Sequence, residues 1–253
     1  MAYSAPELLA ATASRLLTDH KIVFAGVGTP LLASVLAKST HAPDLTIVVE
    51  GGVVGLEAVP GRLPISTNEM RAGNRAMMLL SITQTFLYAQ RGFFDYGFLG
   101  GAQVDRHGNI NTSVIGPPER PRVRLPGSGG ACDIITHCRE IFIVTMHERR
   151  RFVERVDFVT SPGYLEGGDA RRRAGLLFGT ISTVVTDLAL MRFDPQTKQM
   201  RLDGLQAGVT VDQVRERTGF DLPAAPELIR LQAPTDEELR VLRTLDPDRL
   251  FLG

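Results

Sequence analysis

Apolar residues first recur at helical spacing and then gather into short continuous runs. Ser4 and Glu7 form a capping box ahead of leucines at positions 8, 9, 16 and 17, which predicts an amphipathic helix that ends near Asp19-His20. Apolar runs over 21–24 and 45–49 predict short buried strands. Between them, an Ala/Leu-rich stretch to about Ala37 predicts a second helix.

The same alternation of strands and helices continues to the end of the chain. Further predicted strands cover 95–99, 140–146, 156–160 and 181–186, and a small hairpin covers 193–202. We expect the strand over 181–186 to be the last buried one in the chain. Predicted helices are a short one over 86–92, one opening at Ala131-Cys132-Asp133-Ile134, and two short ones that begin at the capping boxes Thr210/Gln213 and Thr235/Glu238. We therefore expect one α/β domain over residues 1–253, with a single open, mostly parallel sheet flanked by helices.

The segment from Val53 to about Gly73 departs from this periodicity. It is rich in glycine and proline, but no shift in composition marks a domain boundary. We interpret it as a long functional loop rather than a linker.

Composition narrows the functional classes. Of the 253 residues, 43% are hydrophobic and 22% charged, and 28 Lys+Arg balance 28 Asp+Glu, so charge gives no reason to expect nucleic acid or an anionic membrane as partner. The two cysteines, Cys132 and Cys138, fit neither a metal site nor a disulfide framework, which favours a reducing cytosol. The first residues lack the pattern of a signal peptide, and no apolar run reaches membrane-spanning length.

Arginine clusters at 149–151 and again at 171–173. Such runs are most often solvated faces. A site for a phosphate-bearing ligand is the sharper hypothesis.

Glu50 is the strongest candidate for chemistry. It closes the apolar run that begins at Leu45, and Gly51-Gly52 follow at once. A carboxylate at the end of a buried strand is costly to desolvate, and ligands bind at the carboxyl ends of strands in open α/β sheets. The paired glycines let a ligand or another backbone come close. Glu50 is therefore placed as a nucleophile or general base, unless it simply faces water.

Other elements could supply backbone donors. Glycine-rich segments at 26–28, 100–101 and 127–130 could direct N–H groups at a phosphate or an oxyanion, or merely form tight turns. Nucleotide-binding motifs are absent, and Ser128 lacks the spacing of a hydrolase nucleophile elbow. We expect no metal site, because His41, His107 and His147 follow no ligand spacing and are better explained as loop or helix-cap residues.

Several of these segments stand in an order seen in one family. They are Glu50-Gly51-Gly52, Phe98-Leu99-Gly100-Gly101-Ala102-Gln103-Val104-Asp105, Gly108-Asn109-Ile110-Asn111 and Gly127-Ser128-Gly129-Gly130-Ala131. Later matches include 146–152, 157–163 and 218–222. Over nearly its whole length the chain resembles the β subunits of family I coenzyme A transferases, those of the glutaconate type above all.

The resemblance implies a fold, a reaction and a set of roles. The fold would be the coenzyme A transferase (NagB/RpiA-like) fold. Glu50 would be the covalent nucleophile, and backbone amides of the segment Gly129-Gly130-Ala131 would form an oxyanion hole near the thioester. Gly100, Gly101 and Gln103 would lie at the edge of the active site, in a structural or CoA-contacting role.

The resemblance also implies a partner and no cofactor. A separate α subunit of similar fold would complete an α2β2 or larger cytoplasmic enzyme, with coenzyme A as substrate and no resident cofactor. CoA would move between an acyl-CoA and a small mono- or dicarboxylic acid through a glutamyl-CoA thioester. The alternatives are a CoA-ester hydrolase, lyase or decarboxylase on the same scaffold, and a non-catalytic ligand-binding subunit.

Overall fold

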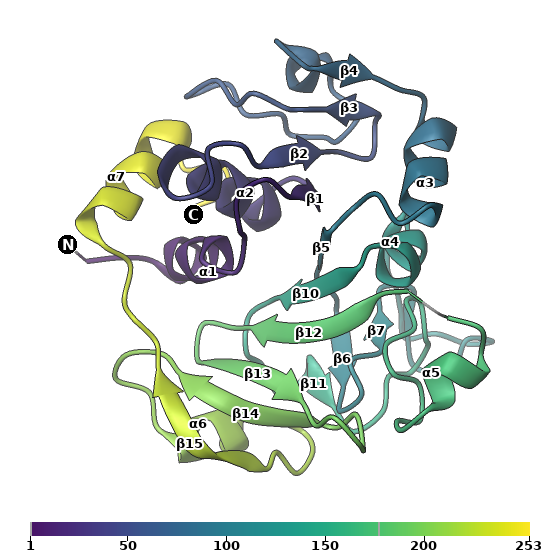
Figure 1. Cartoon of the computed structure of the whole chain (residues 1–253). Helices are drawn as coiled ribbons and strands as arrows, with labels where there is room; N and C mark the ends of the chain where they lie inside the picture. Colours follow the sequence, from purple (N-terminus) through teal and green to yellow (C-terminus); the bar gives the residue numbers. More distant parts are fainter. Residues whose placement is uncertain (1, 177) are drawn as a thin grey trace. The chain divides into compact units, whose positions relative to one another are not determined.

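The computed structural model describes residues 2–176 and 178–253, which fall into two compact units (Figure 1). The first comprises residues 1–98, 137–139 and 232–253, and the second comprises 99–136 and 140–231. No helix in the described chain is both long enough and apolar enough to span a bilayer. The expectation of a single domain over 1–253 stays a prediction.

The first unit contains an α/β arrangement with parallel strands at its centre. Its elements are α1 (Ala5–Ser14), β1 (Ile22–Phe24), α2 (Thr29–Thr40), β2 (Thr46–Val48), β3 (Val53–Val54), the 3-10 helix η1 (Met70–Gly73), β4 (Met78–Leu79), α3 (Ile82–Gln90), β5 (Tyr96–Leu99) and α7 (Asp236–Leu245). The strands follow the order β5-β1-β2-β3-β4, with β1 parallel to β5 and β2, and β3 antiparallel to β2 and β4.

Helices α1, α2 and α7 pack together beside these strands (Figure 1). The predicted capping box of α1 is present, with the Ser4 hydroxyl accepting from the Glu7 N–H and the Glu7 carboxylate accepting from the Ser4 N–H. Ion pairs from Arg15 to Glu238 (2.6 Å) and from Arg243 to Glu7 (2.7 Å) fasten the C-terminal helix to α1. The chain's two ends therefore close one core.

The second unit holds the remaining elements. They are β6 (Gln103–Asp105), β7 (Ile110–Asn111), β8 (Val114–Ile115), β9 (Val123–Arg124), α4 (Ala131–His137), β10 (Glu140–Val144), β11 (Phe152–Val153), α5 (Ala170–Arg173), β12 (Thr180–Val185), β13 (Ala189–Phe193), β14 (Met200–Leu205), α6 (Val211–Glu216) and β15 (Ala224–Arg230). Strands run in the order β15-β14-β13-β12-β10, parallel at β10–β12 and β14–β15 and antiparallel between. Separate small sheets join β11-β6-β7 and β8-β9.

The predicted α/β class, with a mostly parallel sheet flanked by helices, is confirmed, and several details differ. Residues 156–160 do not form the predicted strand: Phe158 and Val159 are exposed, and the neighbouring strand is β11 instead. The strand over 181–186 is not the last buried one, because β13 and β14 also carry buried residues. The first helix ends at Ser14 rather than near His20.

The segment 53–73 is only partly a loop. It contains β3, which turns straight back along β2, and η1. Short paired strands of two residues are too brief for periodicity to reveal, so the pattern alone could not predict them.

Candidate active site

Glu50 lies at the tip of a tight hairpin at the carboxyl end of β2. Val48 pairs antiparallel with Val54, the N–H of Val49 donates to the Val53 carbonyl at 3.0 Å, and the N–H of Gly52 donates back to the Val49 carbonyl at 3.0 Å. Glu50 is thus the first central residue of a four-residue turn. Its predicted place at the end of a buried strand is confirmed.

The Glu50 side chain is held by its backbone alone. It is half-buried, and among the described residues no hydrogen bond or ion pair engages its carboxylate. A carboxylate that stabilises nothing in its surroundings is available to a reactant. The turn therefore fixes the backbone that carries the group, and no partner in the described chain occupies its two oxygens.

Gly51 and Gly52 are needed because the chain itself covers the turn. A Cβ on Gly51 would overlap the Thr67 carbonyl oxygen, and one on Gly52, whose φ is +99°, would overlap the Leu80 carbonyl oxygen. The Leu80 N–H also donates to the Gly52 carbonyl at 2.8 Å. Of the two predicted reasons for the glycines, close approach of another backbone is thus the one that the structure shows.

A cavity of about 470 Å³ opens beside this turn, within the first unit. Gly51 and Val53 form one side of it, and residues of 67–74 and 79–80 form the rest. The size falls in the range of small-molecule sites. The sequence predicted a functional loop here, but not that the loop would fold back against the glycines.

The segment after Gly127 carries donors that the described chain leaves open. Gly127 and Gly129 have φ of +98° and +49°, and no atom lies within 4 Å of where a Cβ of either would be. The Ala131 N–H donates to Ser128 and that of Ile134 to Gly130, which begins α4 as predicted. Within the described residues, the N–H groups of Gly129 and Gly130 have no acceptor. Both can donate to a developing oxyanion.

Gly100 and Gly101 lie just before β6, and Gln103 is its first residue. A Cβ on Gly101 would overlap the side chain of Ile110, and the Gly101 carbonyl accepts from Arg151 at 2.9 Å. The Gln103 side chain is buried. Its Oε1 accepts from Asn111 Nδ2 at 2.7 Å and from the Asp157 N–H at 3.0 Å, while its Nε2 donates to Asp157 Oδ2 at 3.2 Å. The role that the structure shows for Gln103 is therefore structural, and a contact with CoA stays a prediction.

Glu50 belongs to the first unit and the segments at Gly100 and Gly129 to the second. The described chain thus has a carboxylate without a partner in the first unit and amide N–H groups without an acceptor in the second. Their convergence on one acyl group stays a prediction.

His147 plays a structural part. It is buried in the loop between β10 and β11, with ring nitrogens 3.0 Å from the hydroxyls of Thr186 and Thr218 and its ring stacked on Phe152. Burial lowers the pKa of His147 to about 4. It was expected to be a loop or helix-cap residue, and it lies in a loop, where its neutral ring links Thr186 to Thr218.

This depressed pKa predicts a loss of stability in acid. Below pH 6.5 the unfolded chain takes up a proton that folded His147 refuses, so the free energy of unfolding falls as the pH drops toward 4. The contribution of this residue amounts to about 3 kcal/mol. Urea unfolding at a series of pH values gives the free energy of unfolding as a function of pH, and its slope between pH 6.5 and 4 should be shallower in His147→Gln than in the wild type. The matched control is His20→Gln, because His20 is exposed; an equal slope in all three proteins would contradict the account.

Comparison with known proteins identifies relatives along the whole chain. The family model described as Coenzyme A transferase matches residues 7–217. The 3-oxoadipate CoA-transferase B subunit of Pseudomonas knackmussii is 39% identical over 97% of this chain and 94% of its own length. The glutaconate CoA-transferase B subunit of Acidaminococcus fermentans is 34% identical over 99% of this chain and 95% of its own.

Structures agree with the sequences. The crystal structure of glutaconate coenzyme A-transferase from Acidaminococcus fermentans superposes with a TM-score of 0.92 at 32% identity, covering 99% of this chain and 98% of that one. A protein with different chemistry is also similar: the cholesterol ring-cleaving hydrolase IpdB subunit of Rhodococcus jostii is 30% identical over 87% of this chain and 83% of its own.

Proposed function

Because the chain belongs to the family I coenzyme A transferases, among their β subunits, we propose that with its α partner it moves CoA between an acyl-CoA and a small carboxylic acid. The observation that carries the proposal is the unengaged carboxylate of Glu50, fixed at the tip of the β2–β3 turn. A nucleophile must be held near the reacting atom, and its oxygens must not already be engaged in structural hydrogen bonds or ion pairs.

The chemistry follows from that carboxylate. A Glu50 oxygen attacks the thioester carbonyl carbon of the donor, the carbon–sulfur bond breaks, and CoA thiolate leaves an acyl–glutamyl anhydride. The thiolate then attacks the Glu50 carbonyl carbon, which gives a glutamyl-CoA thioester and releases the first acid as its carboxylate. The acceptor carboxylate reverses both steps, so protons and electrons balance without any redox partner.

Backbone amides stabilise the charge that develops in these steps. We assign this role to the N–H groups of Gly129 and Gly130, at the segment that leads into Ala131 and α4. Fixed donors lower the barrier most where water is excluded and no reorganisation is needed. We assign Gly100, Gly101 and Gln103 to the edge of the site, where the buried network around β6 holds the Gln103 side chain.

The acids are proposed to be dicarboxylic. Two CoA-transferase relatives that match nearly the whole chain are named for 3-oxoadipate and glutaconate, both of which carry a second carboxylate. A panel of mono- and dicarboxylic CoA esters separates these donors, and the preferred one is expected among the dicarboxylic members.

Initial rates test the transferase proposal. Acyl-CoA consumption by the complex of the chain with its α subunit, called the α–β complex below, is measured at several concentrations of acceptor acid. A covalent intermediate predicts parallel lines in a double-reciprocal plot, and consumption of no more than one acyl-CoA per active site when the acceptor is left out.

A hydrolase is the second candidate, favoured by the similarity to the Rhodococcus jostii protein. It predicts steady consumption of a CoA ester without any acceptor, together with turnover that survives replacement of Glu50. A non-catalytic ligand-binding subunit predicts binding without consumption.

An exposed apolar surface supports the need for an α subunit. The segment that carries it runs from η1 through β4 and α3 to the turn after α3 (Figure 1). Its exposed apolar residues are Met70, Met77, Met78, Leu79, Ile82, Leu87 and Phe93. In the described part of the first unit, β4 also ends the strand order with its outer edge unpaired. Exposed edges and Met-rich apolar patches are typical of surfaces that a partner covers. We propose that the α subunit does so here, in an α2β2 or larger enzyme.

A charge placed on this surface should weaken assembly. Leu87→Glu is expected to raise the dissociation constant of the α–β complex by about tenfold or more, because an unpaired carboxylate would be buried in the interface. Sedimentation velocity of the mixed subunits measures this. Leu250→Glu, at a similarly exposed leucine on another segment, is the control. Unchanged assembly of Leu87→Glu would place the partner elsewhere.

A further inference from the structure

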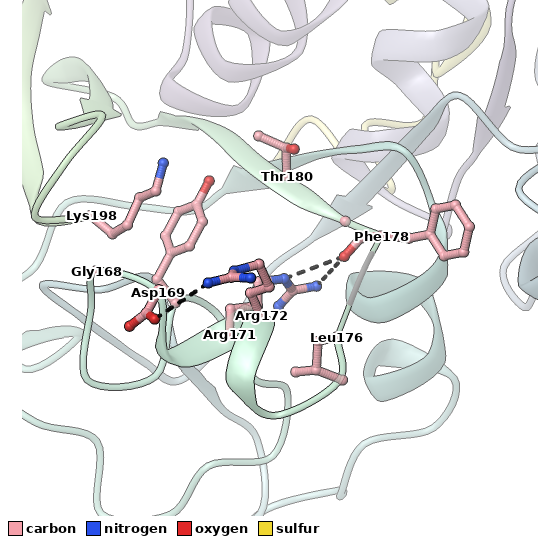
Figure 2. Close-up of a pocket in the computed structure, with 10 residues that line it drawn as sticks. Gly168, Asp169, Arg171, Arg172, Leu176, Phe178, Thr180 and Lys198 are labelled. Carbon is pink, nitrogen blue, oxygen red and sulfur yellow. Dashed lines mark hydrogen bonds and ion pairs between the residues drawn. The ribbon is translucent and has the colours of Figure 1, made fainter.

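The second unit contains a pocket of about 300 Å³ whose walls carry mostly positive charge (Figure 2). It is formed by the loop around Tyr164, the short helix α5, the start of β12 and the turn between β13 and β14. Arg171, Arg172 and Lys198 contribute cations to its lining, and Asp169 contributes the carboxylate. None of these residues takes part in the proposed acyl chemistry.

Arg171 is a buried cation without a carboxylate partner in the described chain. Only 6% of the residue is exposed, and its guanidinium donates to backbone carbonyls alone. The acceptors are Pro162 (2.6 Å), Gly163 (2.8 Å), Ile135 (2.6 Å) and Phe178 (2.8 Å), the last drawn in Figure 2. Carbonyl dipoles satisfy its N–H groups but leave its charge unneutralised. The floor of the pocket is therefore electropositive.

A hydrogen-bonded turn over residues 194–198 fixes the backbone of Lys198 at the rim of the pocket. The Asp194 carboxylate accepts from the N–H groups of Gln196 and Thr197, and Lys198 itself is held at φ +58°. The N–H of Gly168 donates to the Thr197 carbonyl at 3.0 Å, which docks this turn against the pocket's other wall. Lys198 Nζ lies 5.4 Å from the centre of the Tyr164 ring, and no ion pair engages it among the described residues.

The one carboxylate of the described lining, that of Asp169, is already paired with two arginines. Asp169 pairs with Arg172 at 3.7 Å and also with Arg173, which is not part of the pocket lining. The pocket thus keeps an excess of positive charge that an anion would neutralise. Beside the cations, Leu176 and the half-exposed ring of Phe178 provide an apolar wall.

We propose that this pocket binds a phosphate group and that, resting on the proposed function, this phosphate belongs to the adenosine 3′,5′-bisphosphate end of the CoA substrate. Lys198 and Arg172 hold the phosphate, the charge of Arg171 attracts it from below, and the adenine ring packs on Phe178. Arginine and lysine beside an aromatic face match a phosphorylated nucleoside in both charge and shape.

Titration calorimetry on the α–β complex tests the site, with adenosine 3′,5′-bisphosphate and inorganic phosphate as separate probes. Loss of one charge-assisted contact in Lys198→Ala should raise the dissociation constant of the bisphosphate about tenfold. The KM for acyl-CoA should rise by a similar factor with kcat unchanged, because the contact is the same in ground and transition states. Arg120→Ala, which removes an equal charge at an exposed residue outside the lining, should change neither quantity more than about twofold.

The outcomes separate this inference from the proposed function. In one outcome the wild type transfers CoA, while Lys198→Ala has the same KM and the same affinity for the bisphosphate. That result overturns the proposed phosphate site and leaves the transferase proposal standing. Binding of inorganic phosphate but not of the bisphosphate overturns the assignment to CoA and shows a phosphate from another source. Bisphosphate binding that Lys198→Ala weakens, in a complex that transfers no CoA, supports the pocket and overturns the transferase.

Discussion

Glu50→Gln is expected to lower kcat for CoA transfer by about 10⁴-fold or more, because an amide cannot form the anhydride and thioester that the reaction requires. The free energy of unfolding should change by less than about 0.5 kcal/mol, since no hydrogen bond or ion pair in the described chain engages that carboxylate. Steady-state rates with the α–β complex, together with urea unfolding of each variant, measure the two effects.

The control for this variant is Glu57→Gln. Glu57 lies on the same stretch of chain and pairs with Lys38 at 2.8 Å on the surface, so its loss should leave kcat unchanged. Glu50→Asp keeps the carboxylate but withdraws it by one methylene, and its rate should fall between those of the wild type and Glu50→Gln. Turnover of Glu50→Gln at the wild-type rate would favour the hydrolase over the transferase.

Gly52→Ala should reduce activity by about 100-fold or more while leaving Glu50 itself intact. The new Cβ would overlap the Leu80 carbonyl oxygen, and the backbone there has φ +99°, so the turn that carries Glu50 must move. A displacement of the reacting group by about 1 Å costs roughly that factor, and the strain should lower the free energy of unfolding by about 3 kcal/mol.

Gly208→Ala separates strain from overlap. Gly208 has φ +78°, but no atom lies within 4 Å of where its Cβ would be. This variant should lose only about 1–2 kcal/mol of stability and no activity. If Gly52→Ala were as active and as stable as Gly208→Ala, the packing of Leu80 against the turn would not position Glu50.

Local signals predicted much of the fold. The capping boxes at Ser4, Thr210 and Thr235 are all formed, because both of their hydrogen bonds join residues only three positions apart and need no contact with distant parts of the chain. The largely apolar runs predicted as strands over 21–24 and 140–146 form β1 at 22–24 and β10 at 140–144, because short continuous runs of this kind favour burial within a sheet. The order of family motifs then predicted the coenzyme A transferase fold, which the comparisons confirm.

Features that depend on distant parts of the chain could not be predicted. Residues 156–160 have the composition of a strand, yet Asp157 is drawn into the hydrogen-bond network of Gln103 and the segment stays irregular. The covering of Gly51 and Gly52 by the carbonyls of Thr67 and Leu80 is likewise a tertiary contact.

The two arginine runs show the same limit. Both were expected to be solvated faces or phosphate sites. Arg150 is exposed and pairs with Glu148, whereas Arg171 is buried among carbonyls from three segments. Composition alone could not distinguish the two, since burial depends on what folds over each run.

Intact mass spectrometry tests the central claim most directly. The chain, purified with its α subunit, is incubated with a dicarboxylic acyl-CoA and no acceptor, and its mass is then measured. The proposal predicts a gain equal to CoA less one water, mapped to Glu50 and removed when a carboxylic acid is added. Consumption of the CoA ester with no gain in mass would contradict it.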